Sequence, residues 1–339
     1  MKVVTFGEIM LRLAPRGNLR FVQADSFEAA YGGGEANVAV SLAGFGLDAA
    51  FVTKLPDNEI GQSAINSLRR YGVDTTFIAR GGERIGIYYL EKGASQRPSK
   101  VIYDRASSSI ATATAADFDF DRIFEGADWF HFTGITPALS DNAASLCEQA
   151  CKIAKSNGLK VSCDLNYRGK LWSKAKAKAV MTKLMKYVDI LIANEEDAKD
   201  VFGIDAESSD ISGGKLSKEG YAKVADALIK MFGFAYSAIT LRKSFSASDN
   251  NWSALLCDGK DCYFSKEYDI RIVDRVGGGD SFGAGLIYAM LKGYDNRRAI
   301  EFAAGASCLK HSIEGDYNLV SVEEIERLAA GDGSGRVQR

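Results

Sequence analysis

The 339-residue chain is poor in the side chains from which several common active sites are built. It holds two histidines, His131 and His311, which argues against a histidine-based catalytic triad and against a histidine-rich metal site. Its six cysteines are scattered, and no two have the C-x-x-C spacing of a metal or redox site. The sequence therefore predicts no metal site made of protein ligands.

The chain also lacks a surplus of positive charge and any long apolar run. Its 42 Lys and Arg against 44 Asp and Glu give a net charge of -2, so no basic excess is left to neutralise nucleic-acid phosphates. No apolar run approaches the length that crosses a bilayer, and the N-terminus leads directly into a strand-like segment, 2–6, without a signal-peptide pattern. We expect a cytoplasmic protein that binds neither nucleic acid nor membrane.

Two of the cysteines, Cys257 and Cys262, flank a turn at 258–261 and can face each other across a hairpin. Thiols in the cytosol are kept reduced, and a free cysteine behaves as a small apolar residue. We therefore interpret both as reduced core thiols.

What the sequence does contain is a glycine-rich segment, Asp274–Gly285, in which Gly277, Gly278 and Gly279 precede Asp280. The residues before the glycines alternate like a strand, and the apolar residues after them recur at helical spacing. The glycines therefore lie at a helix N-terminus, where the first amide groups lack intrahelical partners and the macrodipole is positive. With no Cβ in the way, such a turn is predicted to bind an anion.

A carboxylate beside an anion site is typical of phosphoryl transfer, in which an acceptor hydroxyl is aligned while charge on the moving group is neutralised. Asp280 is the candidate base. The helix dipole favours its ionised form and makes it a weak base, but in a loose transition state the carboxylate mainly orients the nucleophile. The same pattern also fits a plain N-cap aspartate that follows a glycine loop.

Strand-like and helix-like segments alternate along most of the chain, which implies right-handed crossovers and a parallel sheet. We predict an α/β fold: a doubly wound, mostly parallel sheet flanked by helices, with a small β-sheet lid. One domain covers residues 1–330, and the lid strands are inserted at about 10–31 and 84–108. Residues 331–339 are expected to be a mobile tail.

The lid is predicted from a hairpin pattern over residues 85–105. A hairpin centred on Gln96 places Tyr89 opposite Tyr103. Tyr89, Tyr103 and Arg105 then project from one face, because side chains two apart in a strand share a face. They form either two aromatic walls and a cation over a ligand or an amphipathic hairpin with a solvated arginine.

Polar residues follow two other predicted strands. The stretch Asp164–Arg168, with Asn166 within it, ends one strand, and Asn194–Asp197 ends the next. In open parallel sheets the ligand crevice lies beyond the carboxyl ends of the strands, so both stretches are site candidates. The carboxylates of the second also fit as first-turn charges of the following helix.

The fingerprints G-x-G-x-x-G and G-x-x-x-x-G-K-[ST] are absent, so nucleotide binding is inferred from a resemblance. The segment Asp274–Asp280 resembles the C-terminal signature D-T-x-G-A-G-D of ribokinase-like (PfkB) carbohydrate kinases, with Arg275 and Gly278 in place of Thr and Ala. The similarity runs in order along nearly the whole chain. Further matching segments are Gly32–Ala39, Asp164–Arg168, Asn194–Asp197 and Thr240–Arg242.

Within this family, segments 7–13, 88–91 and 97–105 look most like the kinases of 2-keto-3-deoxygluconate. The resemblance implies transfer of the γ-phosphate of ATP, with Mg²⁺, to the 6-hydroxyl of this acid, with Asp280 as base and Gly277–Gly279 as anion hole. It also implies binding roles for further residues. Those expected at the sugar acid are Gly34, Tyr89, Tyr103, Arg105, Asn166 and Arg168, with Asn37 as a further candidate, and those expected at the nucleotide are Asn194, Thr240, Gly277 and Gly279.

An acidic substrate agrees with the arginines, because a guanidinium donates paired hydrogen bonds to a carboxylate. Arg105 is the discriminating residue, since D-x-N-x-R also occurs in fructokinase-like relatives. Two alternatives remain open. One is a fructokinase, ribokinase or 2-ketogluconate kinase on the same scaffold, and the other is a non-catalytic nucleotide or sugar sensor. We expect a small-molecule partner and a homo-oligomer formed through the lid sheet.

Overall fold

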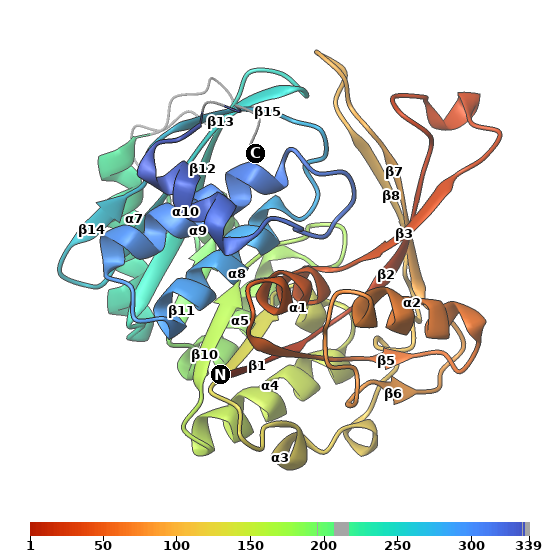
Figure 1. The fold of residues 1–339 in the computed structure, drawn as a ribbon. Helices are drawn as coiled ribbons and strands as arrows, with labels where there is room; N and C mark the ends of the chain where they lie inside the picture. Colours follow the sequence, from red (N-terminus) through yellow and green to blue (C-terminus); the bar gives the residue numbers. More distant parts are fainter. Residues whose placement is uncertain (195, 207–216, 334, 336–339) are drawn as a thin grey trace.

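The computed structural model describes residues 1–194, 196–206, 217–333 and 335. Most of the expected tail at 331–339 therefore lies outside the described residues. Figure 1 shows a large α/β body with a small sheet beside it. The strands of the main sheet run in the order β14 (Cys262–Phe264), β13 (Asp249–Cys257), β12 (Tyr236–Ser244), β11 (Ile190–Ala193), β10 (Lys160–Asp164), β9 (Trp129–Thr133), β1 (Lys2–Phe6) and β4 (Asp48–Val52), and β15 (Tyr268–Arg271) pairs with β13.

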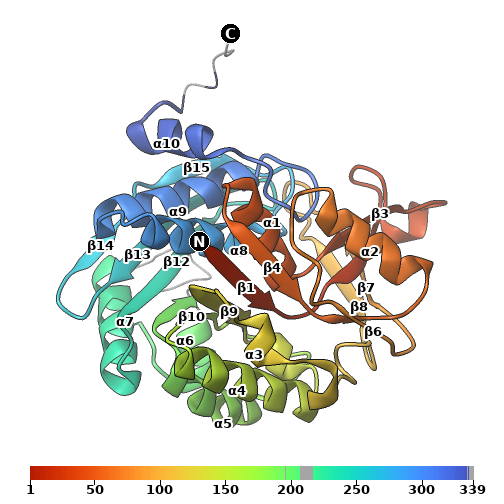
Figure 2. The same ribbon diagram turned by 60° about the horizontal axis from the view of Figure 1, so that its bottom comes forward.

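The strands from β4 to β12 are parallel to their neighbours, and β13 begins an antiparallel edge. Helices cover both faces of this sheet, as Figure 2 shows. One face carries α3 (Phe120–Ile123), α4 (Asp141–Ser156), α5 (Lys174–Leu184), α6 (Asp197–Phe202) and α7 (Lys218–Phe232), and the other carries α1 (Gly34–Gly44), α8 (Gly278–Leu291) and α9 (Asn296–Lys310), with α2 (Glu59–Arg69) and α10 (Val322–Ala330) at its margins. The predicted doubly wound α/β class is confirmed.

Local sequence explains why these elements form. In α4 the apolar residues recur three and four positions apart and are buried, and the hydroxyl of Ser140 caps the helix by accepting a hydrogen bond from the amide of Ala143 at 3.0 Å. In β9 every residue is buried, as expected for a parallel strand covered on both faces. Shorter elements are β5 (Lys54–Leu55), β6 (Ala79–Arg80) and the 3₁₀ turns Phe21–Gln23, Ala115–Asp117, Thr136–Ala138 and Met185–Tyr187.

The small sheet has the order β3 (Glu28–Gly32), β2 (Met10–Ala14), β7 (Gly86–Glu91) and β8 (Lys100–Asp104). The predicted hairpin register was wrong by one residue, because Tyr88, not Tyr89, pairs with Tyr103. Ala94 pairs with Arg97, so the turn is centred between Ser95 and Gln96 and the pairing is not symmetric about Gln96. A shift of one residue moves every side chain of a strand to the other face.

The interpretation of Cys257 and Cys262 as free thiols was also wrong. They pair directly across β13 and β14 and are joined by a disulfide. The hairpin explains this contact, because its register brings the two side chains together on one face. The remaining four cysteines are free. Among the described residues, no helix has the length and apolar character needed to span a bilayer.

Candidate active site

A cavity of about 420 Å³ opens beyond the carboxyl ends of β9, β10 and β11. The chain runs outward from β1 in both directions across the sheet, to β4 on one side and to β9 on the other, so the cavity lies at the topological switch point of the fold. Its floor comes from the N-termini of α1 and α8, and its cover comes from Tyr88, Val101 and Tyr103 of the small sheet.

The residues that the sequence suggests for the site come together around this one cavity, with one exception. Those that line it are Gly34, Asn37, Tyr103, Arg105, Asn166, Arg168, Asn194, Thr240, Gly277, Gly278, Gly279 and Asp280. Tyr89 does not line the cavity. Its ring lies on the opposite face of the small sheet, edge-on to Phe27 with 6.0 Å between centroids, and Tyr88 takes the inward position because of the one-residue register difference.

The turn before α8 has the shape of an anion site. Gly277 has φ +84°, and a Cβ there would lie 2.0 Å from the carbonyl oxygen of Asp316, so the position requires glycine. A Cβ on Gly278 would meet the ring of His311 at 2.5 Å. The amide of Ser281 is bonded to the Gly277 carbonyl at 2.9 Å, which leaves the amides of Gly279 and Asp280 ahead of the intrahelical ladder.

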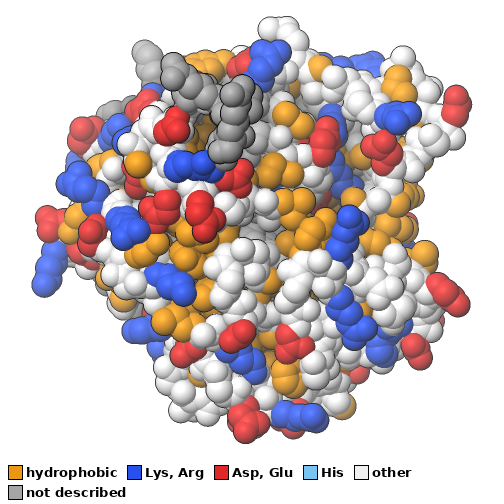
Figure 3. Space-filling model, viewed as in Figure 1, with side chains coloured by type: hydrophobic (Ala, Val, Ile, Leu, Met, Phe, Trp, Pro, Cys, Tyr) orange, Lys and Arg blue, Asp and Glu red, His pale blue; other side chains and the backbone are white. Residues whose placement is uncertain are grey.

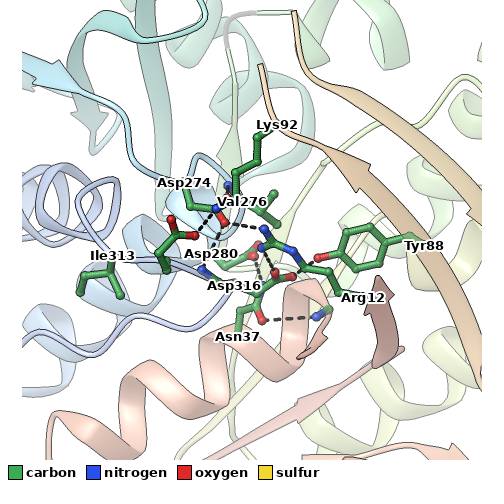
Figure 4. Close-up of polar contacts among 12 residues, drawn as sticks. Arg12, Asn37, Tyr88, Lys92, Asp274, Val276, Asp280, Ile313 and Asp316 are labelled. Carbon is green, nitrogen blue, oxygen red and sulfur yellow. Dashed lines mark hydrogen bonds and ion pairs between the residues drawn. The ribbon is translucent and has the colours of Figure 1, made fainter. Parts of the chain in front are cut away.

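Asp280 lies in the first turn of α8 and faces the start of α1. The amide Nδ2 of Asn37 donates a hydrogen bond to its Oδ2 at 2.6 Å, as Figure 4 shows. A Cβ on Gly34 would lie 3.6 Å from its Oδ1. One carboxylate oxygen is therefore held by α1, and the other lies beside a glycine that leaves room for a ligand.

Burial raises the pKa of Asp280 to about 6, against the opposing effects of the Asn37 hydrogen bond and of Arg168. The sequence alone suggests a low pKa from the helix dipole. Loss of water outweighs that contribution here, because the half-buried carboxylate sits between two helix starts under the small sheet. A pKa near neutrality suits a group that must accept a proton.

A second carboxylate, Glu35, anchors α1 at the site. Its Oε1 accepts hydrogen bonds from the Thr133 amide at 2.9 Å, the Thr133 hydroxyl at 2.8 Å and the Thr136 hydroxyl at 2.7 Å. Burial raises the pKa of Glu35 to about 7, and these hydrogen bonds oppose the rise. These hydrogen bonds were not predicted from the sequence. They hold the N-terminus of α1 against the end of β9 and thereby fix the position of Asn37.

Arg105 lines the cavity, but its guanidinium group is paired with the carboxylate of Glu8. Its Nε donates to Oε2 of the buried Glu8 at 2.8 Å, and its Nη2 bonds the same oxygen. The hydroxyl of Ser108 donates to Oε1 of Glu8 at 2.6 Å. This pair was not predicted from the sequence, because Glu8 and Arg105 are far apart along the chain and meet only when β7 pairs with β2, the strand that follows Glu8.

Arg168 has a different environment. It follows β10, is half-buried and lines the cavity. Its side chain makes no hydrogen bond or ion pair with any residue that the structure describes, and its charge lowers the pKa of both Asp164 and Asp280 against the effect of their burial. The geometry therefore offers Arg168 as the guanidinium that is available to an anionic ligand.

A buried charged network links the small sheet to the loops around the glycine turn (Figure 4). Arg12 of β2 donates to Asp316 at 2.7 Å and to Asp274 at 2.5 Å, and the Tyr88 hydroxyl donates to Asp316 at 2.6 Å. These side chains are buried. Removing one partner of such a network leaves an unpaired buried charge, so the network fixes the position of the small sheet over the cavity.

The opposite end of the cavity is cationic and aromatic. Arg242, Arg275, Trp252 and His311 line it together with Asn194 and Thr240. Burial lowers the pKa of Arg275, and the nearby charge of Arg242 lowers it further. Two guanidinium groups held close together in a partly buried cleft favour a multiply charged anion between them. Arg275 occupies the position where the family signature has threonine.

Asp164 is the carboxylate that fits a divalent cation at this site. It lines the cavity, and burial raises its pKa well above the ordinary value, with Asp197 and Asp280 adding to the rise. Asp197 instead receives hydrogen bonds from the amides of Tyr167 at 3.0 Å and Asn194 at 2.9 Å. The described residues contain no cluster of three or more metal-type ligands. This arrangement suits Mg²⁺, which binds through one or two carboxylates together with phosphates.

The chain was compared with known proteins. The model of the "pfkB family carbohydrate kinase" family matches residues 1–321. A solved structure of 2-dehydro-3-deoxygluconokinase from Thermotoga maritima is 55% identical, with a TM-score of 0.94 and coverage of 98% of both chains. A solved PfkB family carbohydrate kinase from Listeria grayi is 36% identical, with a TM-score of 0.90 and coverage of 97% of this chain and 100% of that chain. A 2-dehydro-3-deoxygalactonokinase from Haloferax volcanii is 32% identical over 98% of both chains.

The raised pKa of Asp280 predicts how one substitution changes stability. Its folded-state pKa of about 6 lies above the ordinary 3.8, so its contribution to stability is full below about pH 4 and is lost as pH rises through about 6. Asp280→Asn stays neutral and can still accept the hydrogen bond from Asn37. We expect it to raise the melting temperature of the ligand-free protein at about pH 8 and to leave it unchanged at about pH 4.

Differential scanning calorimetry checks this expectation. Asp25→Asn, at an exposed position, is the control and should change the melting temperature little at either pH. An equal gain for Asp280→Asn at both pH values, or a loss at the higher one, would contradict the assignment of a desolvated carboxylate.

Proposed function

Because the chain belongs to the pfkB family of carbohydrate kinases, we propose that it transfers the γ-phosphate of ATP to the 6-hydroxyl of 2-keto-3-deoxygluconate. The observation that carries the proposal is one cavity that holds a desolvated carboxylate, Asp280, together with the guanidinium of Arg168, which has no hydrogen-bond or ion-pair partner among the described residues. The first suits a hydroxyl nucleophile, and the second suits an acidic substrate. The names of two relatives, a 2-dehydro-3-deoxygluconokinase and a 2-dehydro-3-deoxygalactonokinase, support the same substrate class.

Asp280 is proposed to align the acceptor hydroxyl and to take its proton. Asn37 holds one carboxylate oxygen at 2.6 Å, so the other is left to face the substrate. A pKa of about 6 means that the group is ionised at neutral pH and still basic enough to accept a proton as the bond to phosphorus forms. Asn37 thus acts as a positioning residue rather than as a sugar contact.

The amides at the start of α8, at Gly277–Gly279, are proposed to hold the charge of the transferring phosphoryl group. The rest of the nucleotide would then extend toward Asn194 and Thr240, where Arg242 and Arg275 meet its phosphates. Mg²⁺ bound with the nucleotide would neutralise phosphate charge, and Asp164 is the residue that would hold it. Asp164, otherwise disfavoured in its ionised form by burial, would become a matched charge.

The substrate carboxylate is proposed to bind Arg168, with Asn166 and Gly34 completing the floor of the sugar site. Arg105 keeps its place in the wall, but Glu8 already matches its charge, so its contribution is hydrogen bonding rather than net charge. Tyr88 and Tyr103 replace the expected pair of Tyr89 and Tyr103 as the aromatic cover. A cover of this kind excludes water that would otherwise hydrolyse ATP.

Other sugar kinases on the same scaffold are the main alternative. Turnover of 2-keto-3-deoxygluconate, its galactonate epimer, 2-ketogluconate, fructose and ribose, followed by ADP formation, separates them. A panel in which fructose or ribose is the best substrate would overturn the acid specificity. Binding of ATP and sugar acid without any ADP would favour a sensor.

Asp280→Asn is expected to lower kcat by roughly 10²- to 10⁴-fold, with KM for both substrates nearly unchanged, because it removes the base and keeps the fold. For the wild type we expect kcat/KM to rise with pH through about 6, as Asp280 loses its proton. A steady-state assay coupled to ADP formation measures both. A variant with near-normal kcat would refute the role of Asp280.

Arg168→Leu is expected to raise KM for the sugar acid roughly 10- to 100-fold, since it removes a charged hydrogen-bond donor, while KM for ATP stays within about twofold. Arg271→Leu, which removes an exposed arginine of β15, is the matched control and should leave both values unchanged. If KM for ATP rose instead of KM for the acid, Arg168 would belong to the nucleotide.

We also propose that the small sheet joins two copies of the chain. Its outward face carries Leu11, Leu13, Ile87, Tyr89 and Ile102, which the strand register places in one apolar layer. Figure 3 shows hydrophobic side chains gathered on this side of the molecule. Ile102 is 53% exposed and lies within this apolar layer, and a contiguous exposed apolar surface is typical of an interaction site.

Ile102→Lys is expected to shift the protein from dimer to monomer, because it places a charge in the apolar layer. Light scattering after size-exclusion chromatography measures the mass. Val22→Lys, at a 91% exposed position outside the sheet, is the control and should leave the dimer intact. A wild-type protein that is monomeric at all concentrations would rule the interface out.

A further inference from the structure

Lys310 ends α9 and is fully buried, although lysine is among the residues least often found inside proteins. Its ammonium donates hydrogen bonds to three backbone carbonyls: Gly315 at 2.7 Å, Ile313 at 3.1 Å and Asp274 at 3.4 Å. A charged ammonium has three N–H donors and no acceptor. The carbonyl cage therefore supplies one acceptor for each hydrogen of the protonated form.

The cage lies directly under the glycine turn. Asp274 begins the segment that leads into the turn, and Gly315 precedes Asp316, whose carbonyl oxygen packs against Gly277. The Cε of Lys310 would lie 3.3 Å from a Cβ on Gly277. The Lys310 ammonium thus joins the loop that contains Asp274 to the loop that contains Gly315. Gly277 packs between these two loops.

Other bonds make the end of α9 a platform for the same turn. The carbonyl of His311 accepts from the amide of Val273 at 2.8 Å, and the Ser307 hydroxyl donates to the carbonyl of Gly278 at 2.7 Å. These contacts are neutral, whereas Lys310 adds a full positive charge. That charge acts on Asp280, where it opposes the burial that raises the pKa of the carboxylate.

The three carbonyl acceptors favour the protonated form of Lys310, and the neighbouring carboxylates act in the same direction. Burial lowers the pKa of Lys310, and Asp274 and Asp316 oppose this effect, while Arg12 adds to it. Both aspartates are bound to Arg12, so the buried charges form one set of two cations and two anions beneath the turn. Such a set is stable only when each member has its hydrogen bonds, which the carbonyl cage provides for Lys310.

We propose that Lys310 is a built-in monovalent cation that positions the amides of the glycine turn and strengthens their positive potential toward the transferring phosphoryl group. A set of backbone carbonyls is also the coordination with which proteins bind K⁺. Here the lysine ammonium occupies that set, so turnover needs no alkali cation. The inference rests on the proposed kinase reaction and assigns Lys310 a positioning role in it.

The first test uses the wild type and needs no variant. Its kcat with ATP and 2-keto-3-deoxygluconate is measured in a buffer whose monovalent cation is tetramethylammonium, which is too large for the cage, and again with added KCl. The expected result is the same kcat in both. A strict requirement for potassium would overturn the proposal.

The second test empties the cage. Lys310→Ala is expected to lower kcat about 10²- to 10³-fold in tetramethylammonium buffer, with KM for the sugar acid little changed. Ammonium or potassium should then restore turnover in a saturable way. Lys310→Gln, which fills the space and donates hydrogen bonds without charge, should stay slow and should not be rescued. Lys292→Ala, at an exposed lysine after α8, is the matched control.

Melting temperatures keep the test decisive if Lys310→Ala is poorly folded. Ammonium should raise the melting temperature of this variant and leave that of the wild type unchanged. A Lys310→Ala protein that keeps normal kcat, or one that is folded and that no monovalent cation rescues or stabilises, would overturn the proposal. Failure of the wild type to phosphorylate the acid in any buffer would instead count against the proposed function, and the cation-dependent melting temperature would still report on the cage.

Discussion

The structure depends on keeping one carboxylate, Asp280, in a place where it has little water and few partners. Two helix N-termini meet there, and the Asn37 amide at 2.6 Å is its one side-chain hydrogen bond among the described residues. In this setting burial outweighs the helix dipole and raises the pKa to about 6. The contacts around Asp280, which include the hydrogen bonds of Glu35 in α1 and the close packing of the glycines of α8, hold the two helix N-termini in place on either side of it.

Maintaining that setting requires buried charge elsewhere. Arg12, Asp274, Asp316 and Lys310 form a set whose members are each satisfied by hydrogen bonds, and Tyr88 joins it from the small sheet. A comparable apolar core would hold the loops as firmly, so stability alone does not explain such a set. It does explain an ammonium group held close to the glycine turn and a cover whose position is coupled to that turn.

Sequence reasoning worked best where the residues of a feature are contiguous. The glycines, the helix start and Asp280 follow each other, so local propensity predicts their arrangement, and the positions of Asp164 and Asn194 follow from strand ends in a parallel sheet. It was less successful for the hairpin, where a one-residue change in register decides whether Tyr88 or Tyr89 faces inward. No local feature of the sequence distinguishes these two registers.

Individual side-chain contacts between distant segments were not predicted from the sequence. Glu8 meets Arg105, and Lys310 meets the carbonyl of Asp274, only through the complete fold. The contact between Cys257 and Cys262 was predicted, but the two residues were wrongly interpreted as free thiols. That interpretation relied on an expected cytosolic location, where thiols stay reduced, and not on the geometry of the hairpin. In the sequence, a buried lysine at the end of a helix cannot be distinguished from an exposed one until the loops around it are placed.

The titration of the Asp280 carboxyl group tests the central claim most directly. Protein labelled with ¹³C at the aspartate carboxyl carbons is titrated by NMR without ligands, and the resonance that is missing from Asp280→Asn identifies the residue. The account predicts a midpoint at about 6. A midpoint near 3.8, the ordinary value for aspartate, would mean that the carboxylate is solvated and would contradict the account.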